Sequence, residues 1–416
     1  MQSLFASIQI FRHRAFAFYW FGRLFATLAT LTQSVTLGWQ VYAIARLTES
    51  IAHSAFLVGM VGLVQFLPLF ALTLIAGQIS DRHDRRKIII VSLSLQVLCA
   101  IGLVVIAISK QPSLVAIFIV ASLFGVARAF TMPASGALGP MLVPHALLPR
   151  AIAWNSLSIQ AGMVFGPWLG GVLSAASTQT AYTAAAGLYC VAIGMFSLIR
   201  AHTKPAPQSA TRSTMIREGL AYIWRSKVVF GAISLDLFAV LLGGVTALLP
   251  VYARDILAIG PEGFGLLRSG PALGGGVVAL VLSVRPIQRH AGPWMLGAVA
   301  VYGLATIVFA LSQIVALSMA ALIVLGAADV ISVFVRQSLV QIVTPDAMRG
   351  RVSAVSGLFI SASNELGEFE SGVAARLLGP IGAAIFGGVG AIAVTMIWSK
   401  LFPALRRADK IVAPHL

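Results

Sequence analysis

Charged side chains are scarce in the long apolar stretches of this sequence, so the few that occur there are candidates for function. Glu365, Glu368 and Glu370 form the densest acidic group in such a stretch. Glu365 and Glu368 would share one helix face, whereas Glu370 lies about 140° from Glu365 on an ideal helix. Two neighbouring carboxylates in a low dielectric should not both ionise, so one could carry a proton at physiological pH. This chemistry suits proton-coupled transport, and the alternative is that the acids face an outer vestibule and attract cations or water.

Four further ionisable residues fall inside apolar stretches. Arg128 and Asp329 lie about midway along theirs, and Arg23 and Asp236 lie near one end of theirs. Burying a charge at the membrane centre costs about 3 kcal/mol or more, so such residues usually serve a function. Arg128 could pair with Asp329, and Arg23 with Asp236, or each could be satisfied within its own half of the chain. With the three glutamates, these residues define the expected substrate and proton cavity.

Composition places these residues in a membrane protein. The chain has 416 residues, of which 58% are hydrophobic and 10% charged, and its mean hydropathy is +0.93. Soluble domains carry roughly 25% charged residues, so a soluble globular protein is excluded. The net charge of +16 would suggest a nucleic-acid partner in a soluble protein. Basic residues collect in the cytoplasmic loops of membrane proteins, however, so the lipid bilayer is the expected partner and nucleic acid is not.

The apolar stretches predict an all-α integral membrane protein with twelve transmembrane helices. Each stretch is long enough to cross a hydrocarbon core of roughly 30 Å. The expected helices span residues 15–44, 54–77, 87–109, 113–141, 148–174, 180–200, 228–253, 262–284, 293–312, 315–341, 350–376 and 380–403.

Basic residues between the spans predict the orientation. With a cytoplasmic N-terminus, most Lys and Arg residues fall in cytoplasmic segments, which is the usual bias, and both termini lie inside. The basic residues in the outer segments are then Arg46, Lys110, Arg254 and Arg376. Arg268 and Arg336 lie nearer the ends of their spans, so we expect both to snorkel to the interface.

The chain divides into two equal halves. The predicted parts are an N-terminal six-helix bundle at 1–200, a cytoplasmic linker at 201–227, a C-terminal six-helix bundle at 228–403 and a cytoplasmic tail at 404–416. A shift of 201 residues aligns Gly125 with Gly326, Arg128 with Asp329, Arg150 with Arg351, Gly166 with Gly367 and Gly171 with Gly372. Such internal repeats are typical of transporters built from two pseudo-symmetric bundles.

The loop between the second and third spans carries a recognisable motif. The stretch from Gly77 to Lys87 reads G-Q-I-S-D-R-H-D-R-R-K, and it resembles the signature loop of the major facilitator superfamily. The matching residues are Gly77, Asp81, Arg82, Arg85 and Arg86, while Asp84 replaces a glycine of the family pattern. The resemblance implies that Asp81 and this basic cluster form a conformational latch. The alternative is a solvated basic loop. The equivalent loop of the second half, residues 285–292, has no acid, so the latch should be one-sided.

A second motif lies in the fifth span. Residues 162–171 read G-M-V-F-G-P-W-L-G-G, and closely spaced glycines let helices approach at backbone distance. The order resembles the antiporter motif of major facilitator exporters, which favours export over uptake. The matching residues are Gly162, Gly166, Pro167, Gly170 and Gly171. The alternative is plain small-residue packing.

Stretches along the whole chain resemble the bacterial efflux branch of this superfamily that includes siderophore exporters. The resemblance implies a monomeric secondary transporter in the bacterial inner membrane that exports a small organic solute, siderophore-like or an amphiphilic drug, by proton antiport. A lipid flippase or an uptake carrier of the same fold is the alternative.

An enzyme or sensor is disfavoured because no zinc-protease, nucleophile-elbow or phosphate-loop motif occurs. Cys99 and Cys190 both lie in apolar stretches and have no metal-ligand spacing. We therefore expect neither a cofactor nor a metal.

Overall fold

The protein is all-helical over the residues that its computed structural model describes, which are 9–201, 203–204 and 212–409. Within them, ten helices are long and apolar enough to cross a membrane. The helix α2 is not among these ten because Arg23, Gln33 and Gln40 make it more polar, but its 32 residues are long enough to cross. Counting α2, and dividing the longest helix at its kink, gives the twelve crossings that the sequence predicts.

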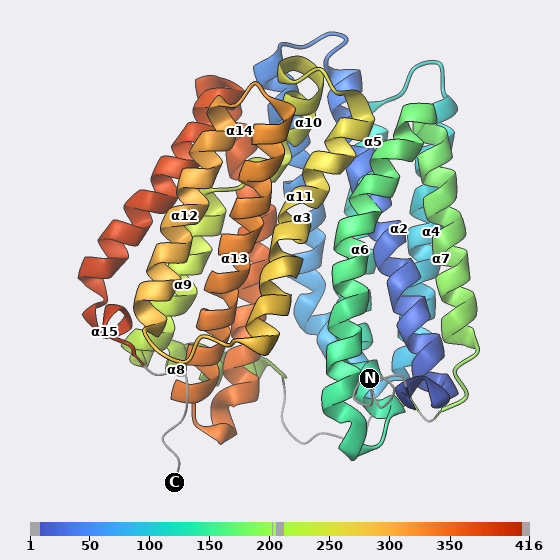
Figure 1. Cartoon of the computed structure of the whole chain (residues 1–416). Helices are drawn as coiled ribbons and strands as arrows, with labels where there is room; N and C mark the ends of the chain where they lie inside the picture. The colour runs from blue at the N-terminus through green and yellow to red at the C-terminus, as the bar shows by residue number, and fades with distance from the viewer. Residues whose placement is uncertain (1–8, 202, 205–211, 410–416) are drawn as a thin grey trace. The chain divides into compact units, whose positions relative to one another are not determined.

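The helices of the first half follow the predicted spans closely, and Figure 1 shows their path. The short 3-10 helix η1 (Gln9–Arg12) leads into the first crossing, and η2 (Gly139–Leu142) and η3 (His145–Leu147) join α5 to α6. The long helices are α2 (Arg14–Ala45), α3 (Ile51–Arg82), α4 (Arg85–Ile108), α5 (Leu114–Leu138), α6 (Leu148–Ala176) and α7 (Thr178–Ser197).

The second half contains two irregular crossings. The first begins as α9 (Lys227–Leu242) and continues beyond Gly243 through η4 (Val245–Leu248), α10 (Leu249–Val251) and η5 (Tyr252–Ile256). The last two predicted spans form one element, α14 (Asp346–Leu401), which is kinked at Gly379. Gly379 has φ of +75° and is followed by Pro380, so the chain turns there between two crossings. The regular crossings are α11 (Gly260–Val284), α12 (Ala291–Leu311) and α13 (Val315–Val343).

Two compact units make up the chain. Unit 1 comprises residues 1–44, 64–211 and 260–269, and unit 2 comprises residues 45–63, 212–259 and 270–416. The first part of α3 thus packs in unit 2, and the first part of α11 packs in unit 1. Each half of the sequence therefore contributes the start of its second long helix to the unit formed mainly by the other half.

Glycines mark equivalent helix crossings in the two units. A Cβ on Gly125 of α5 would lie within 3.0 Å of the Gln65 backbone, and one on Gly326 of α13 would meet the Pro271 backbone just as closely. Because Gly125 and Gly326 align in the internal repeat, the same close approach of helices occurs twice. The repeat seen in the sequence is thus a repeat of packing.

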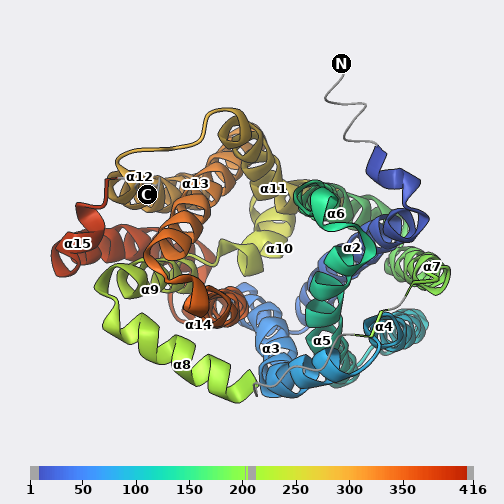
Figure 2. The same cartoon turned by 90° about the horizontal axis from the view of Figure 1, so that it is seen from below.

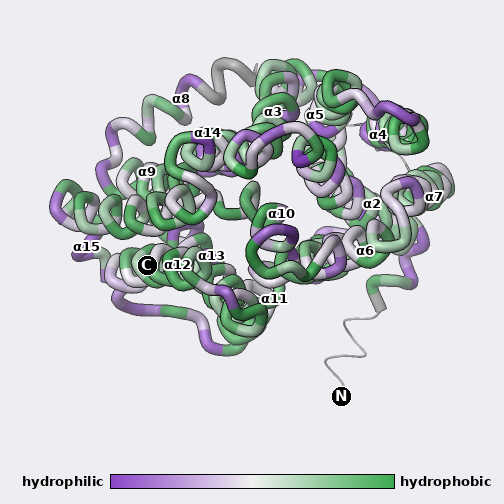
Figure 3. Tube along the Cα trace, turned by 90° about the horizontal axis from the view of Figure 1, so that it is seen from above, coloured by the Kyte–Doolittle hydropathy of each residue, from purple (hydrophilic) through white to green (hydrophobic). Residues whose placement is uncertain are grey.

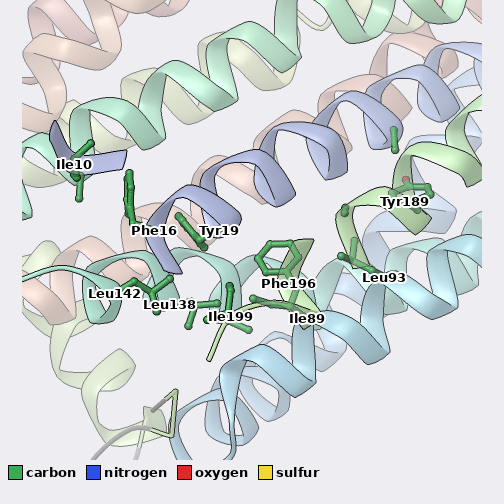
Figure 4. Close-up of a cluster of buried hydrophobic side chains, with 14 of the residues drawn as sticks. Ile10, Phe16, Tyr19, Ile89, Leu93, Leu138, Leu142, Tyr189, Phe196 and Ile199 are labelled. Carbon is green, nitrogen blue, oxygen red and sulfur yellow. The ribbon is translucent and has the colours of Figure 1, made fainter. Parts of the chain in front are cut away.

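The core of unit 1 gathers side chains from five of its long helices, which are α2, α4, α5, α6 and α7, and Figure 4 shows this cluster. Phe16 and Tyr19 of α2 and Leu138 of α5 are buried with Ile89 of α4 and Phe196 of α7. This packing fixes α2 and α5, which carry Arg23 and Arg128.

A further helix, α8 (Arg212–Arg225), lies within the predicted linker. It carries hydrophilic residues along its length (Figure 3) and packs against α14 (Figure 2). The side chains of Glu218 and Arg351 form an ion pair there, and Tyr222 Oη donates to the Val343 carbonyl. Residues 202 and 205–211 of the linker lie outside the described residues. In the predicted tail, α15 (Pro403–Arg406) is described, and residues 410–416 are not.

Candidate functional site

A buried ion pair joins α9 to α13 in unit 2. Arg336 Nη2 lies 3.3 Å from Asp236 Oδ2, and the two side chains are 1% and 6% exposed. The expectation that Arg336 snorkels to the interface is therefore wrong. Its position near a helix end gave no sign that α9 would place a carboxylate beside it. An arginine without that partner would have to reach water.

A second carboxylate lies beside this pair. Asp329 of α13 and Asp236 line the same small cavity, together with Tyr302 and Ser332. The cavity offers about 10 Å³ to the centre of a water molecule, which is about the space that one water needs. The buried Ser332 Oγ has no hydrogen-bond partner among the described residues. Two carboxylates and one guanidinium thus share a region of low dielectric, which is the kind of arrangement that can bind and release a proton.

Glu368 and Glu370 of α14 lie beside different hydroxyl groups. Thr246 Oγ1 lies 3.2 Å from Glu368 Oε1, so it can donate to that carboxylate. A Cβ on Gly62 of α3 would meet the Glu365 carbonyl and the Glu368 side chain, so α3 packs directly on this stretch. Glu370 Oε2 lies 3.5 Å from Ser371 Oγ. Glu368 therefore lies between α3 and the α9–η4 bend, within unit 2.

The two predicted cavity arginines of unit 1, Arg23 and Arg128, donate to neutral oxygens. Arg23 Nη1 donates to Tyr19 Oη at 2.9 Å and to Ser135 Oγ at 2.8 Å. Arg128 Nη1 donates to Gln65 Oε1 at 3.1 Å. Each guanidinium thus has a neutral hydrogen-bond acceptor within its own unit. Tyr19 and Ser135 were not among the predicted cavity residues.

The signature loop places its residues at the end of α3 and the start of α4. Arg85 Nη2 lies 3.6 Å from Asp81 Oδ1, and Arg85 Nη1 donates to the Ala137 carbonyl of α5. Arg86 Nη1 donates to the Ile199 carbonyl, whereas the Arg82 side chain is exposed. The loop thereby ties α3, α4 and α5 together at one end of unit 1.

Asp84 replaces the family glycine without strain because it caps a helix. Its φ is −60°, and its Oδ1 accepts hydrogen bonds from Arg86 N at 3.0 Å and Lys87 N at 3.4 Å. Thr203 Oγ1 donates to the same oxygen. Aspartate is among the favoured N-cap residues, so the sequence alone contained a signal for this role.

The glycines of the fifth span form a seam on α6. Gly162, Gly166, Pro167, Gly170 and Gly171 are all buried. A Cβ on Gly162 or Gly166 would collide with α2, at Thr27 or Leu31, and one on Gly171 would collide with α11 at Gly265. Thr32 Oγ1 donates to the Gly166 carbonyl across the seam. The motif thus brings three helices together at backbone distance.

The structure brings some of the predicted cavity residues together and leaves others apart. Asp236 and Asp329 share one cavity in unit 2, and Arg336 is the main functional candidate that sequence reasoning missed. Arg23 and Arg128 lie in unit 1 with partners of their own. Over residues 9–201, 203–204 and 212–409, no group of three His, Cys, Asp or Glu side chains is placed to hold a metal ion.

Comparison with known proteins assigns the family. Residues 5–415 match the model of a major facilitator family described as transmembrane secretion effectors. The Enterobactin exporter EntS of Citrobacter koseri is 26% identical over 384 residues, covering 91% of each chain. The protein of the same name from Shigella boydii serotype 4 is 27% identical over 369 residues, covering 88% of this chain and 84% of the relative.

Solved transporter structures share the fold. A POT family transporter in complex with 5-aminolevulinic acid superposes with a TM-score of 0.75 at 13% identity, covering 94% of this chain and 96% of the other. A D-xylose-proton symporter gives 0.70 at 14% identity, covering 97% of this chain and 100% of the other. The chain is thus a multi-pass secondary transporter with the major facilitator fold, and it belongs to the transmembrane secretion effector family.

Proposed function

We propose that this transporter exports a small organic solute, siderophore-like or an amphiphilic drug, from the bacterial cytoplasm across the inner membrane. Both termini would lie in the cytoplasm, and the monomer would work by alternating access coupled to proton entry. The support for export is the glycine seam of α6, with its antiporter-like order, and the relatives named as enterobactin exporters.

The observation that carries proton coupling is the cluster of Asp236, Asp329 and Arg336. With both carboxylates ionised, the cluster has one more negative charge than positive charges. Because Asp236 is already paired with Arg336, Asp329 is the group whose protonation removes the excess charge. A proton taken up at Asp329 and released on the other side of the membrane would link the transport cycle to the proton gradient.

Glu368 has a second role in this proposal. It lies where α3 packs on α14 and faces Thr246 beyond the end of α9. A change in its protonation would alter the contact between these helices. Glu365 and Glu370 would attract cationic groups nearby, and Arg23 and Arg128 would attract anionic groups of the solute. The signature loop residues, with the Asp81–Arg85 pair at 3.6 Å, would act as the latch.

The test is internal pH in proteoliposomes that hold the purified protein, recorded while siderophores and amphiphilic cations are added in turn. We expect a substrate-dependent proton flux that Asp329→Asn abolishes and Glu368→Gln reduces. The matched control is Asp255→Asn, which removes a carboxylate from η5, at the end of its crossing, and should keep the flux. Solute export without any proton movement would contradict antiport, and movement of labelled phospholipid in place of solute would favour a flippase.

A further inference from the structure

A groove in unit 1 lies beside the proposed latch and shares Arg82 with it. It lies between the end of α3, the first turns of α4 and the middle of α5, which are neighbours in Figure 2. Its volume is about 720 Å³, within the range of roughly 300–1,000 Å³ that small-molecule sites occupy. The groove is therefore large enough for part of a lipid.

The floor of the groove is apolar and runs along the helices. Ile88, Val91 and Leu95 of α4 line one side, and Val126 and Phe130 of α5 line the other. From Ile88 to Leu95 the helix rises about 10 Å. Val91 is 69% exposed, so the described chain leaves the centre of this floor uncovered. A hydrocarbon chain lying along α4 and α5 would find apolar contacts over that length.

The rim at the loop end is basic. Arg82, Lys87 and Lys204 line it with exposed side chains. The one acid there, Asp84, already accepts hydrogen bonds from two backbone N–H groups of α4 and from Thr203. His83 also lines the groove. Three cationic groups against one locally bonded carboxylate leave a positive rim above an apolar floor.

We propose that this groove binds an anionic phospholipid of the cytoplasmic leaflet, such as phosphatidylglycerol. The phosphate would lie between Lys87 and Lys204 and near Arg82, and one acyl chain would lie along Val91, Leu95 and Phe130. Basic pockets between helices on the cytoplasmic side suit anionic headgroups. A soluble phosphate would leave the apolar floor empty, and a zwitterionic lipid would not match the net positive rim.

The test is titration of the purified, delipidated protein with phosphatidylglycerol, followed by native mass spectrometry. We expect Lys87→Gln and Lys204→Gln each to weaken binding about five-fold, and the double variant about 25-fold. The matched control is the double variant Lys227→Gln and Lys400→Gln, which removes the same charge from unit 2 and should bind like the unaltered protein. The melting temperature without added lipid checks that each variant is folded.

Two further measurements fix the nature of the ligand. Phosphatidylcholine with the same acyl chains should bind more weakly than phosphatidylglycerol to the unaltered protein, and the difference should shrink in the Lys87/Lys204 double variant. Val91→Asn should weaken phosphatidylglycerol but leave glycerol phosphate unaffected. Equal binding of the two lipids, equal losses in the control variant, or full competition by glycerol phosphate would overturn the proposal.

Discussion

Equivalent helices of the two halves keep the same packing and carry opposite charges. Gly125 of α5 and Gly326 of α13 each let a neighbouring helix approach at backbone distance. Three residues further along, α5 has Arg128 where α13 has Asp329. A collision at a helix crossing cannot be relieved by changing a neighbour's side chain when the obstacle is backbone. A charged side chain is not held by this steric limit, so the two halves can carry different charges at Arg128 and Asp329.

The two halves also differ in how they satisfy buried charge. In unit 1, Arg23 donates to the neutral oxygens of Tyr19 and Ser135. In unit 2, Arg336 faces the carboxylate of Asp236. Removing the arginine from unit 1 leaves neutral groups behind, whereas removing it from unit 2 leaves a buried carboxylate uncompensated. The same type of substitution should therefore have unequal effects.

The largest effect is expected at the buried pair. Arg336→Met should lower the free energy of unfolding by about 3–5 kcal/mol, because Asp236 keeps its burial and loses its partner. Thermal unfolding in detergent measures this. Adding Asp236→Leu to Arg336→Met should restore most of the stability. Arg23→Met is the matched variant in unit 1, and an equal loss there would show that the two sites are not different in kind.

The next largest loss of stability is expected at the two equivalent glycine crossings. Gly125→Ala and Gly326→Ala should each cost about 1–3 kcal/mol, because the added methyl group meets the backbone of Gln65 or Pro271 and the helices must separate. Gly136→Ala on α5 is the control, since nothing lies within 4 Å of its built Cβ. Melting temperatures that fall at only one of the two crossings would break the structural equivalence of the halves.

A smaller difference concerns the start of α4. Asp84→Ala should cost about 1 kcal/mol, because the N–H groups of Arg86 and Lys87 lose their acceptor. Asp84→Asn, which keeps an oxygen at the cap, should cost less. Hydrogen exchange of the first turn of α4 would follow the loss directly. Unchanged protection in Asp84→Ala would show that Thr203 and the loop hold this turn without the carboxylate.

The corresponding turn of the second half has no acid of its own and takes one from the tail. His290 N donates to Asp409 Oδ1 at 2.9 Å, and Gly292 N donates to the Ala408 carbonyl at 2.9 Å. The backbone hydrogen bond from His290 lowers the pKa of Asp409 below its usual value, and Arg289 lowers it further. The loop of the second half has no acid in its own sequence, but the folded chain places Asp409 beside it.

The smallest effect follows from this contact. Because the pKa of Asp409 is lowered in the folded state, its stabilisation is present above its ordinary value of about 3.9 and is lost as pH falls through the lowered value. Protease cleavage of the tail should therefore be constant between pH 7 and 5 and increase only in stronger acid. Asp409→Asn should increase cleavage at neutral pH. A pH-dependent change near neutrality would point to a different group.

The sequence by itself determined the helices, their number and the internal repeat, because membrane spans need about 20 apolar residues and therefore leave a strong local signal. It also marked Asp236, Asp329 and the glycines of α6 as unusual. Tertiary structure alone decided the partners. Arg336 lies a hundred residues from Asp236, and the separations of Asp409 from His290 and of Ser135 from Tyr19 both exceed a hundred residues. Burial of a charge depends on which helices meet, and composition and spacing along one helix do not carry that information.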